Sequence, residues 1–199
     1  MVTWLPGLGP HQGATDDHDG AGDVWFTPQP IVDAVAQALG GIDLDPCAHP
    51  CSPVWAAATH RICLQRGGDG LRDPWPGVGG VFANVPYSDV PPWLMRCKLE
   101  AKRRPVLMLI PTRPETRAWQ AHVWQSGAVI VQQVGRIRFV GSDGNVHGNG
   151  MVTTCFVAWE LALAHRLRLA LRDRKIDAFV LRVSDEAEAD RAINAELPF

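Results

Sequence analysis

The stretch VFANVPYSDVPPWLMRCKLEAKRRPVLMLIP, residues 81–111, decides the fold class. A short apolar run opens it and ends at Asn84, and a second apolar run over residues 106–110 ends at Pro111. Residues 92–102, between the two runs, can form a helix. A strand, a helix and a strand in this order predict two parallel strands that are joined by a right-handed crossover.

The sequence upstream adds another helix and another strand. Apolar residues recur at helical spacing over residues 31–39, Pro30 suits a first turn, and Gly40 provides a stop. This pattern predicts a helix that is followed by a short strand at residues 42–45.

The remaining elements are predicted from shorter patterns. They are a short helix at 54–60 within the otherwise irregular stretch 46–70, a helix at 119–125, strands at 128–134 and 153–159, a helix at 161–172 and a last strand at 176–183. The turn-rich residues 141–150 suit an antiparallel hairpin. Strands that alternate with helices, with such a hairpin near the C-terminal end, predict an α/β fold built on a mostly parallel sheet.

Length and composition indicate one compact domain. The chain has 199 residues, and 46% of them are hydrophobic, which is enough for a substantial core. Residues 1–23 are rich in Gly, Asp and His and have no hydrophobic period, so we expect a disordered or loosely attached arm there. A single folded domain is expected to span residues 24–199.

The net charge of −2 argues against a protein that holds nucleic acid by its overall charge. Any contact with DNA must use a local basic surface, for which Arg113 and the pair Arg136 and Arg138 are candidates. The sequence shows no secretory leader and no apolar run long enough to cross a bilayer, so we expect no membrane association. Five cysteines without such a leader predict a reducing cytoplasm, in a bacterial or phage-infected cell.

Potential metal ligands are concentrated in one short stretch. They are Cys47, His49, Cys51, His60 and Cys63. Zinc selects thiolates and imidazoles, so a small zinc-stapled nucleic-acid module is one alternative. However, the stretch contains no C-x-x-C pair and its spacing fits no standard zinc template. We therefore favour buried or incidental cysteines and assign no metal.

Two predicted strands end in residues that can carry chemistry. The first ends in Leu44-Asp45-Pro46, and the next ends in Asn84-Val85-Pro86-Tyr87. Ligands of open α/β sheets bind beyond the carboxyl ends of the strands, which is where these residues are expected. An amide, a proline and an aromatic ring at a strand exit form a rigid polar platform with a stacking face.

Such a platform meets the chemical needs of adenine N6 methylation. The N6 lone pair is delocalised into the purine ring, so the amine is a poor nucleophile. The side-chain carbonyl of Asn84 and the backbone carbonyl of Val85 can accept its two hydrogens and stabilise the positive charge that develops on nitrogen. Tyr87 can stack on an adenine that has been rotated out of the duplex.

Six motifs in order resemble those of phage DNA N6-adenine methyltransferases of the Dam type. They are Trp25-Phe26-Thr27-Pro28, Leu44-Asp45-Pro46, Asp69-Gly70-Leu71 with Trp75, the tetrad 84–87, Leu109-Ile110-Pro111 and Gly135-Arg136-Ile137-Arg138-Phe139. The resemblance covers residues 24 to about 160. It implies the Rossmann-like fold of methyltransferases that use S-adenosylmethionine (SAM), with SAM as cofactor and double-stranded DNA as partner. No obligate protein partner is evident.

The resemblance also implies roles for individual residues. The tetrad Asn84, Val85, Pro86 and Tyr87 is expected to be catalytic. The residues expected at the cofactor are Trp25, Thr27, Pro28, Asp45, Pro46, Asp69 and Leu71, with Asp69 at the adenine amine of SAM. Those expected to contact DNA are Ser88, Arg113, Arg136, Arg138 and Phe139. Residues 111–125 and the hairpin are the candidate readers of the DNA sequence.

The sequence departs from the family pattern at two places. The family tetrad is usually Asn-Pro-Pro-Tyr, whereas Val85 stands at the second position here, although Pro86 still restricts its backbone. Residues 46–50, Pro-Cys-Ala-His-Pro, replace the Gly-x-Gly that follows the first strand in many SAM enzymes. A catalytically weak or inactive SAM- or DNA-binding module, and methylation of RNA or of protein amides, are therefore the alternatives to methylation of DNA.

Overall fold

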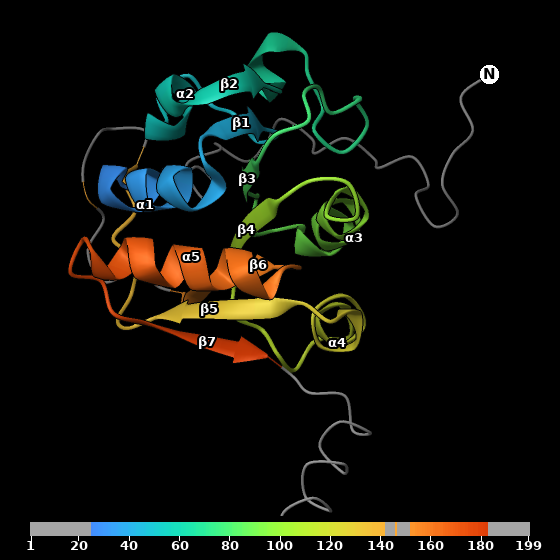
Figure 1. Ribbon diagram of the computed structural model, residues 1–199. Coiled ribbons are helices and arrows are strands. Elements are labelled where there is room, and N and C mark those ends of the chain that lie inside the picture. The colour runs from blue at the N-terminus through green and yellow to red at the C-terminus, as the bar shows by residue number, and fades with distance from the viewer. Residues whose placement is uncertain (1–24, 142–145, 147–151, 183–199) are drawn as a thin grey trace, which may run out of the picture.

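A seven-stranded sheet forms the centre of the computed structural model, which describes residues 25–141, 146 and 152–182 (Figure 1). The strands are β1 (Ile42–Asp45), β2 (Ala58–Arg61), β3 (Val81–Asn84), β4 (Val106–Pro111), β5 (Val129–Gln133), β6 (Thr154–Ala158) and β7 (Ala178–Arg182). The helices are α1 (Gln29–Leu39), α2 (Pro53–Ala57), α3 (Val90–Glu100), α4 (Arg117–His122) and α5 (Leu161–Arg172). Short 3-10 helices span Leu64–Arg66 and Trp124–Ser126.

The sheet is parallel in one half and antiparallel in the other. Its strand order is β2-β1-β3-β4-β6-β5-β7, and the pairs from β2 to β4 are all parallel. β6 runs antiparallel to β4 and β5, and β7 runs antiparallel to β5. The prediction of an α/β fold is therefore confirmed, with a sheet that is parallel in its core, from β2 to β4, and antiparallel beyond it. The carboxyl ends of β1, β3, β4 and β5 lie along one edge of the sheet, called here the carboxyl edge.

Local sequence explains where α1 begins and ends. Pro30 lies in the first turn, where a missing N–H removes no helical hydrogen bond. Gly40 follows the helix with a φ of 73°, a backbone conformation that favours glycine. The next strand, β1, begins two residues later, so a short turn joins the helix to the centre of the sheet.

Helices cover both faces of the sheet. α1 and α5 lie side by side on one face, and α3 and α4 cover the other (Figure 1). Strand residues alternate between the two cores, so that Phe82 belongs to the core under α1 and α5 while Val81 and Ala83 belong to the core under α3 and α4. This alternation explains why the central strands are apolar throughout.

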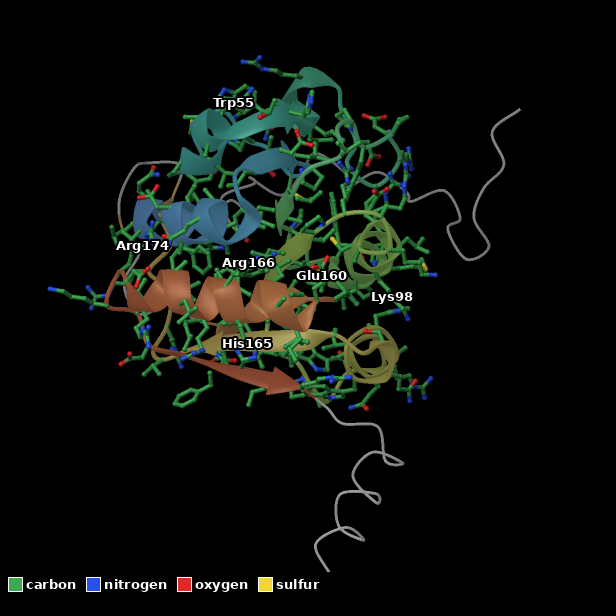
Figure 2. All side chains as sticks on the ribbon, viewed as in Figure 1. Trp55, Lys98, Glu160, His165, Arg166 and Arg174 are labelled. Atoms are coloured by element: carbon green, nitrogen blue, oxygen red, sulfur yellow. The ribbon has the colours of Figure 1, made fainter. Side chains whose placement is uncertain are left out.

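Two arginines of the α5 region tie α5 to α1 (Figure 2). Arg166 Nε donates a hydrogen bond to the Ala38 carbonyl at 3.0 Å. Arg174 Nη1 donates to Gln37 Oε1 at 2.7 Å. Ala38 lies in the last turn of α1, where backbone carbonyls have no partner within the helix, whereas the acceptor at Gln37 is a side-chain oxygen.

Two predictions for short elements were wrong. Residues 58–60, predicted as part of the helix at 54–60, belong to the edge strand β2 because pairing with β1 supplies backbone hydrogen bonds that local propensity does not reveal. The helix predicted at 119–125 spans Arg117–His122 instead, and a 3-10 helix at Trp124–Ser126 follows it. Residues 1–23, most of the turn at 141–150 and residue 183 lie outside the described residues.

Buried Arg104 holds the loop before β3 against the end of α3. Its guanidinium donates to the carbonyl of Pro76 at 2.8 Å, to that of Gly77 at 3.0 Å and to that of Trp75 at 3.4 Å. Arg104 Nε also lies 3.3 Å from Glu100 Oε2, and its side chain is 3% exposed. The Arg104 guanidinium therefore provides donors for three backbone carbonyls of the loop that leads into β3.

We expect Arg104→Ala to lower the free energy of unfolding by about 3 kcal/mol, because it leaves the loop carbonyls without their donor and Glu100 with Arg96 as its remaining ion-pair partner. Denaturant titration measures this loss. Arg103→Ala removes an exposed arginine next to it and is expected to change stability by less than about 0.5 kcal/mol. Equal losses in the two variants would contradict the role given to the buried contacts.

Candidate active site

Residues 25–28, the segment before α1, lie over the carboxyl ends of the central strands. Asn84 Nδ2, at the end of β3, donates a hydrogen bond to the Trp25 carbonyl at 2.7 Å. Phe26 forms an antiparallel bridge with Val140, with N···O distances of 2.8 and 3.0 Å. Its ring also lies 4.8 Å from the ring of His49 in the loop after β1. The predicted cofactor residues at 25–28 therefore lie at the carboxyl edge.

The loop at 69–71 meets the exit of β1. A Cβ at Gly70 would overlap the Pro46 carbonyl oxygen, so this close approach of two backbones requires glycine. Trp75 Nε1 donates to the Gly70 carbonyl at 2.7 Å and holds the loop in place. The fold thus brings together three of the segments in which the sequence predicts cofactor contacts.

Asp45 ends β1 with a carboxyl group that is only 4% exposed. Burial raises its pKa to about 7, against the opposing effects of the Cys47 N–H and the Arg61 charge. The Cys47 N–H donates to Asp45 Oδ1 at 2.9 Å. The group is therefore partly protonated near neutral pH, and a cation bound beside it would favour the carboxylate.

Asp69 takes part in a tight local turn. Its Oδ1 accepts a hydrogen bond from the Leu71 N–H at 2.9 Å, and its Oδ2 lies 3.3 Å from Arg72 Nε. The side chain is still 38% exposed, so its oxygens can also reach a ligand. Leu71 is half-buried against the core under α3 and α4.

Asn84 presents a buried acceptor that has no partner. A backbone carbonyl can only accept a hydrogen bond, so the bond to Trp25 fixes which way the Asn84 amide faces. Its Oδ1 is turned away from that carbonyl and is buried without a hydrogen bond. An unsatisfied buried acceptor costs about 1–3 kcal/mol, which a ligand with an N–H donor would offset.

The other residues of the tetrad occupy different environments. The Val85 side chain is buried in the core under α3 and α4, whereas Pro86 is exposed. The Tyr87 hydroxyl is buried without a partner, and burial keeps its pKa far above the usual value, so the phenol stays neutral. The Tyr87 ring meets Phe139 edge to face, with centroids 6.1 Å apart.

The residues predicted to contact DNA divide into two groups. Ser88, Arg113, Arg136 and Arg138 are exposed. Phe139 is only 5% exposed, and its contact with Tyr87 brings the segment at 135–139 to the tetrad. The structure thus gathers the late arginine motif and the tetrad, with Phe139 as a support for the Tyr87 ring.

Sequence analysis missed a polar cluster where β5 ends and β6 begins. Gln133 Nε2 donates to the Thr154 carbonyl at 2.9 Å and to its hydroxyl at 3.2 Å, and Gln132 Nε2 donates to the same carbonyl at 2.9 Å. Gln133 is 4% exposed, and its Oε1 has no hydrogen-bond partner. The only sign of this cluster in the sequence is a pair of glutamines after an apolar run, and the sequence does not reveal which of the two is buried.

The potential zinc ligands do not form a metal site. Within the part of the chain that the structure describes, no group of three or more His, Cys, Asp or Glu side chains could hold a metal ion. Cys63 donates instead to Gln65 Oε1 at 3.2 Å, and His60 Nε2 lies 3.7 Å from Asp43 Oδ1. The described residues also contain no helix that is long and apolar enough to span a membrane.

Comparison with known families decides the assignment. A family model described as DNA N-6-adenine-methyltransferase (Dam) matches residues 14–174, which is more than half of the chain. The chain belongs to the Dam family. The resemblance found in the sequence is thereby confirmed, and Dam membership implies a methyltransferase that acts on adenine in DNA with SAM as methyl donor. No curated protein matches this chain.

The buried carboxyl of Asp45 gives a test of the site that is independent of any ligand. Its folded pKa of about 7 lies above the ordinary value of 3.8, so between these values the folded state binds more protons than the unfolded state. The contribution of Asp45 to the free energy of unfolding is therefore present below about pH 4 and is lost as pH rises to about 7.

We expect Asp45→Asn to remove this pH dependence, which is measured as the difference in unfolding free energy between variant and parent from about pH 4 to about pH 8. Relative to the parent, the variant should gain stability as pH rises through this range. A difference that is constant with pH would contradict a protonated, buried Asp45.

Proposed function

We propose that this Dam-family chain transfers a methyl group from SAM to N6 of an adenine that is rotated out of double-stranded DNA, and that residues 24–199 form a single Rossmann-like methyltransferase domain. The observation that carries the proposal is the buried, unpartnered Oδ1 of Asn84 at the exit of β3. It is an acceptor of the kind that the adenine amine needs. Family membership supports the reaction class.

The tetrad activates the amine by accepting its hydrogens. Asn84 Oδ1 accepts one N6 hydrogen, and the Val85 carbonyl accepts the other, so that the nitrogen lone pair is directed out of the ring plane toward the methyl group. Tyr87, braced by Phe139, provides a face for the adenine ring. Alignment of nitrogen and methyl carbon then supplies most of the rate enhancement, without a covalent intermediate.

The cofactor segments fit a ligand that combines N–H donors with positive charge. SAM supplies a methyl group on a sulfonium, which is a good leaving group. The Thr27 hydroxyl is fully buried without a partner, and Asp45 is a buried carboxyl that a cation would ionise. Trp25, Pro28 and Pro46 would line the methionine end of SAM, and Asp69 and Leu71 would hold its adenine.

The DNA contacts are local. The net charge of −2 gives no general attraction to DNA, so Ser88, Arg113, Arg136 and Arg138 would meet the backbone next to the flipped base. All five cysteines of the chain are free thiols, which supports a reducing compartment such as the cytoplasm of a bacterial or phage-infected cell.

We expect Asn84→Ala to reduce methyl transfer about 10²- to 10³-fold, because it removes an acceptor that acts on the developing charge. The assay follows labelled methyl from SAM into N6-methyladenine of unmethylated duplex DNA. Equilibrium dialysis with SAM and a thermal melt serve as controls for cofactor binding and folding. A folded Asn84→Ala variant with parental activity would refute the proposed mechanism.

A catalytically weak or inactive binding module is the second candidate, and Val85 is the observation that favours it. Its side chain is buried, so the position is committed to packing rather than to the rigid proline of the family tetrad. If the chain is a methyltransferase, Val85→Pro should raise the transfer rate by restricting Asn84. SAM and DNA binding without transfer in either protein would favour the inactive module.

A further inference from the structure

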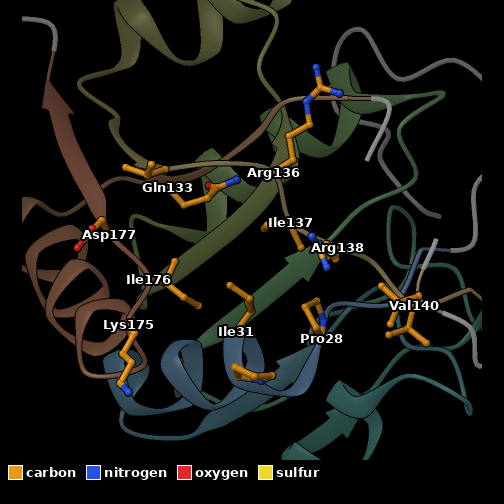
Figure 3. Close-up of a pocket in the computed structure, with 13 residues that line it drawn as sticks. Pro28, Ile31, Gln133, Arg136, Ile137, Arg138, Val140, Lys175, Ile176 and Asp177 are labelled. Carbon is orange, nitrogen blue, oxygen red and sulfur yellow. The ribbon is translucent and has the colours of Figure 1, made fainter. Parts of the chain in front are cut away.

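A cavity of about 600 Å³ lies at the carboxyl edge, lined by the start of α1, the end of β5 and the turn between α5 and β7 (Figure 3). Its apolar lining includes Pro28, Ile31, Ile137 and Ile176, and its polar lining comprises Gln133, Arg136, Arg138, Lys175 and Asp177. This volume is within the range of about 300–1000 Å³ for small-molecule sites, which have apolar walls and few polar groups. No residue of the tetrad lines the cavity, so it is distinct from the proposed site of the target adenine, although it shares Pro28 with the proposed SAM site and Arg136 and Arg138 with the proposed DNA contacts.

Gln133 provides the buried polar group of this cavity. Its Nε2 is held by the carbonyl and the hydroxyl of Thr154, and the carbonyl can only accept, so the amide orientation is fixed. Oε1 is left as a pure acceptor in a side chain that is 4% exposed, and it has no partner. Because Gln133 lines the cavity, a ligand there that donates an N–H would give this acceptor the partner it lacks.

Basic side chains stand at the cavity mouth. Figure 3 shows Lys175 and Ile176, from the turn between α5 and β7, on the opposite side of the cavity from Arg138 and Val140. Arg138 and Lys175 are both exposed. Arg136 and the carboxylate Asp177 are exposed and also line the cavity, so three of its four charged lining residues are cations. Cations on both sides fit a ligand that is flat and apolar inside and anionic outside.

The backbone at Lys175 is unusual. The Lys175 N–H donates to the Arg172 carbonyl at 2.8 Å, and the Ile176 N–H donates to the Leu171 carbonyl at 3.0 Å, which ends α5 in a turn that normally uses glycine. Among the described residues other than glycine, Lys175 alone has a positive φ, at 60°. The long cationic side chain of Lys175 therefore occupies a position at which the backbone conformation favours glycine.

We propose that this cavity binds a second nucleotide of the DNA, distinct from the target adenine, with its base inside and its phosphates at Arg138 and Lys175. Gln133 Oε1 selects a base that presents an N–H or amino group, so the cavity contributes sequence specificity. Ile137 in its wall is two residues from Phe139, which contacts Tyr87, so both bases belong to one stretch of DNA. This inference rests on the proposed action on DNA.

The test uses the full chain and a random duplex library around a fixed adenine. Bound sequences are selected and read, and the same pools are scored for N6-methyladenine. Gln133→Met removes the acceptor, while the Thr154 carbonyl keeps its bond from Gln132. Gln132→Met is the matched control because it removes the neighbouring bond to the same carbonyl.

The parent is expected to prefer particular bases at one position outside the target adenine. Gln133→Met should reduce that preference at least about tenfold and leave other positions unchanged, whereas Gln132→Met should retain it. Unchanged preference in Gln133→Met, or a parent without any preference, overturns the proposal. Weaker SAM binding in Gln133→Met with unchanged base preference assigns the cavity to the cofactor and also overturns it.

The outcomes separate this inference from the proposed function. Base preference that depends on Gln133 without methylation supports the cavity and rejects the methyltransferase. Methylation with a base preference that does not depend on Gln133 supports the methyltransferase and rejects the role proposed for the cavity. If Gln133→Met fails to fold, Ile176→Trp fills the cavity from a half-buried wall and should cause the same loss of preference.

The cations are tested separately. Lys175→Asn keeps a residue that tolerates positive φ and removes the charge. We expect weaker binding to all sequences and a slope of log affinity against log salt that is reduced by about one, with base preference retained. An unchanged slope overturns the phosphate contact at Lys175.

Discussion

The candidate site depends on the hydrogen bond from Asn84 to the Trp25 carbonyl, which joins the end of β3 to the segment before α1. This bond closes the segment before α1 over the exit of β3, and it turns Asn84 Oδ1 away as a free acceptor. Because a carbonyl can only accept, one bond sets both the position and the orientation of the amide. The parallel pairing of β1 with β3 then places Asp45 at the same edge.

Among the described residues, four of the seven buried side-chain polar atoms without a partner belong to the segments that meet at the carboxyl edge, and the other three belong to α3 and α4. Thr27 Oγ1, Asn84 Oδ1 and Gln133 Oε1 are all buried at the carboxyl edge without a partner. Native proteins leave few such atoms, and those that exist mark places where stability is given up for function. The loop before β3 shows the opposite arrangement, because Arg104 satisfies its carbonyls and steadies the strand that ends in Asn84.

The charged side chains are distributed in a way that suits the two proposed partners, SAM and DNA. The carboxyl of Asp45 is buried beside the cofactor segments, where a cation would ionise it. The exposed arginines 113, 136 and 138 follow β4 and β5, on a chain whose net charge is −2. A local basic surface on a weakly acidic protein favours contact with DNA at this edge over contact at arbitrary places.

The sequence by itself determined the central strand, helix and strand, the helices α1 and α5, and the family, because apolar runs and helical periods report local backbone structure and the motifs keep their order. Only the tertiary structure decided that residues 58–61 pair as an edge strand, that Gln133 rather than Gln132 is buried, and that Asn84 bonds to Trp25. It also showed that, among the described residues, no three His, Cys, Asp or Glu side chains form a group that could hold a metal ion. These features depend on strand order and register, which join residues far apart in the chain and leave no local pattern.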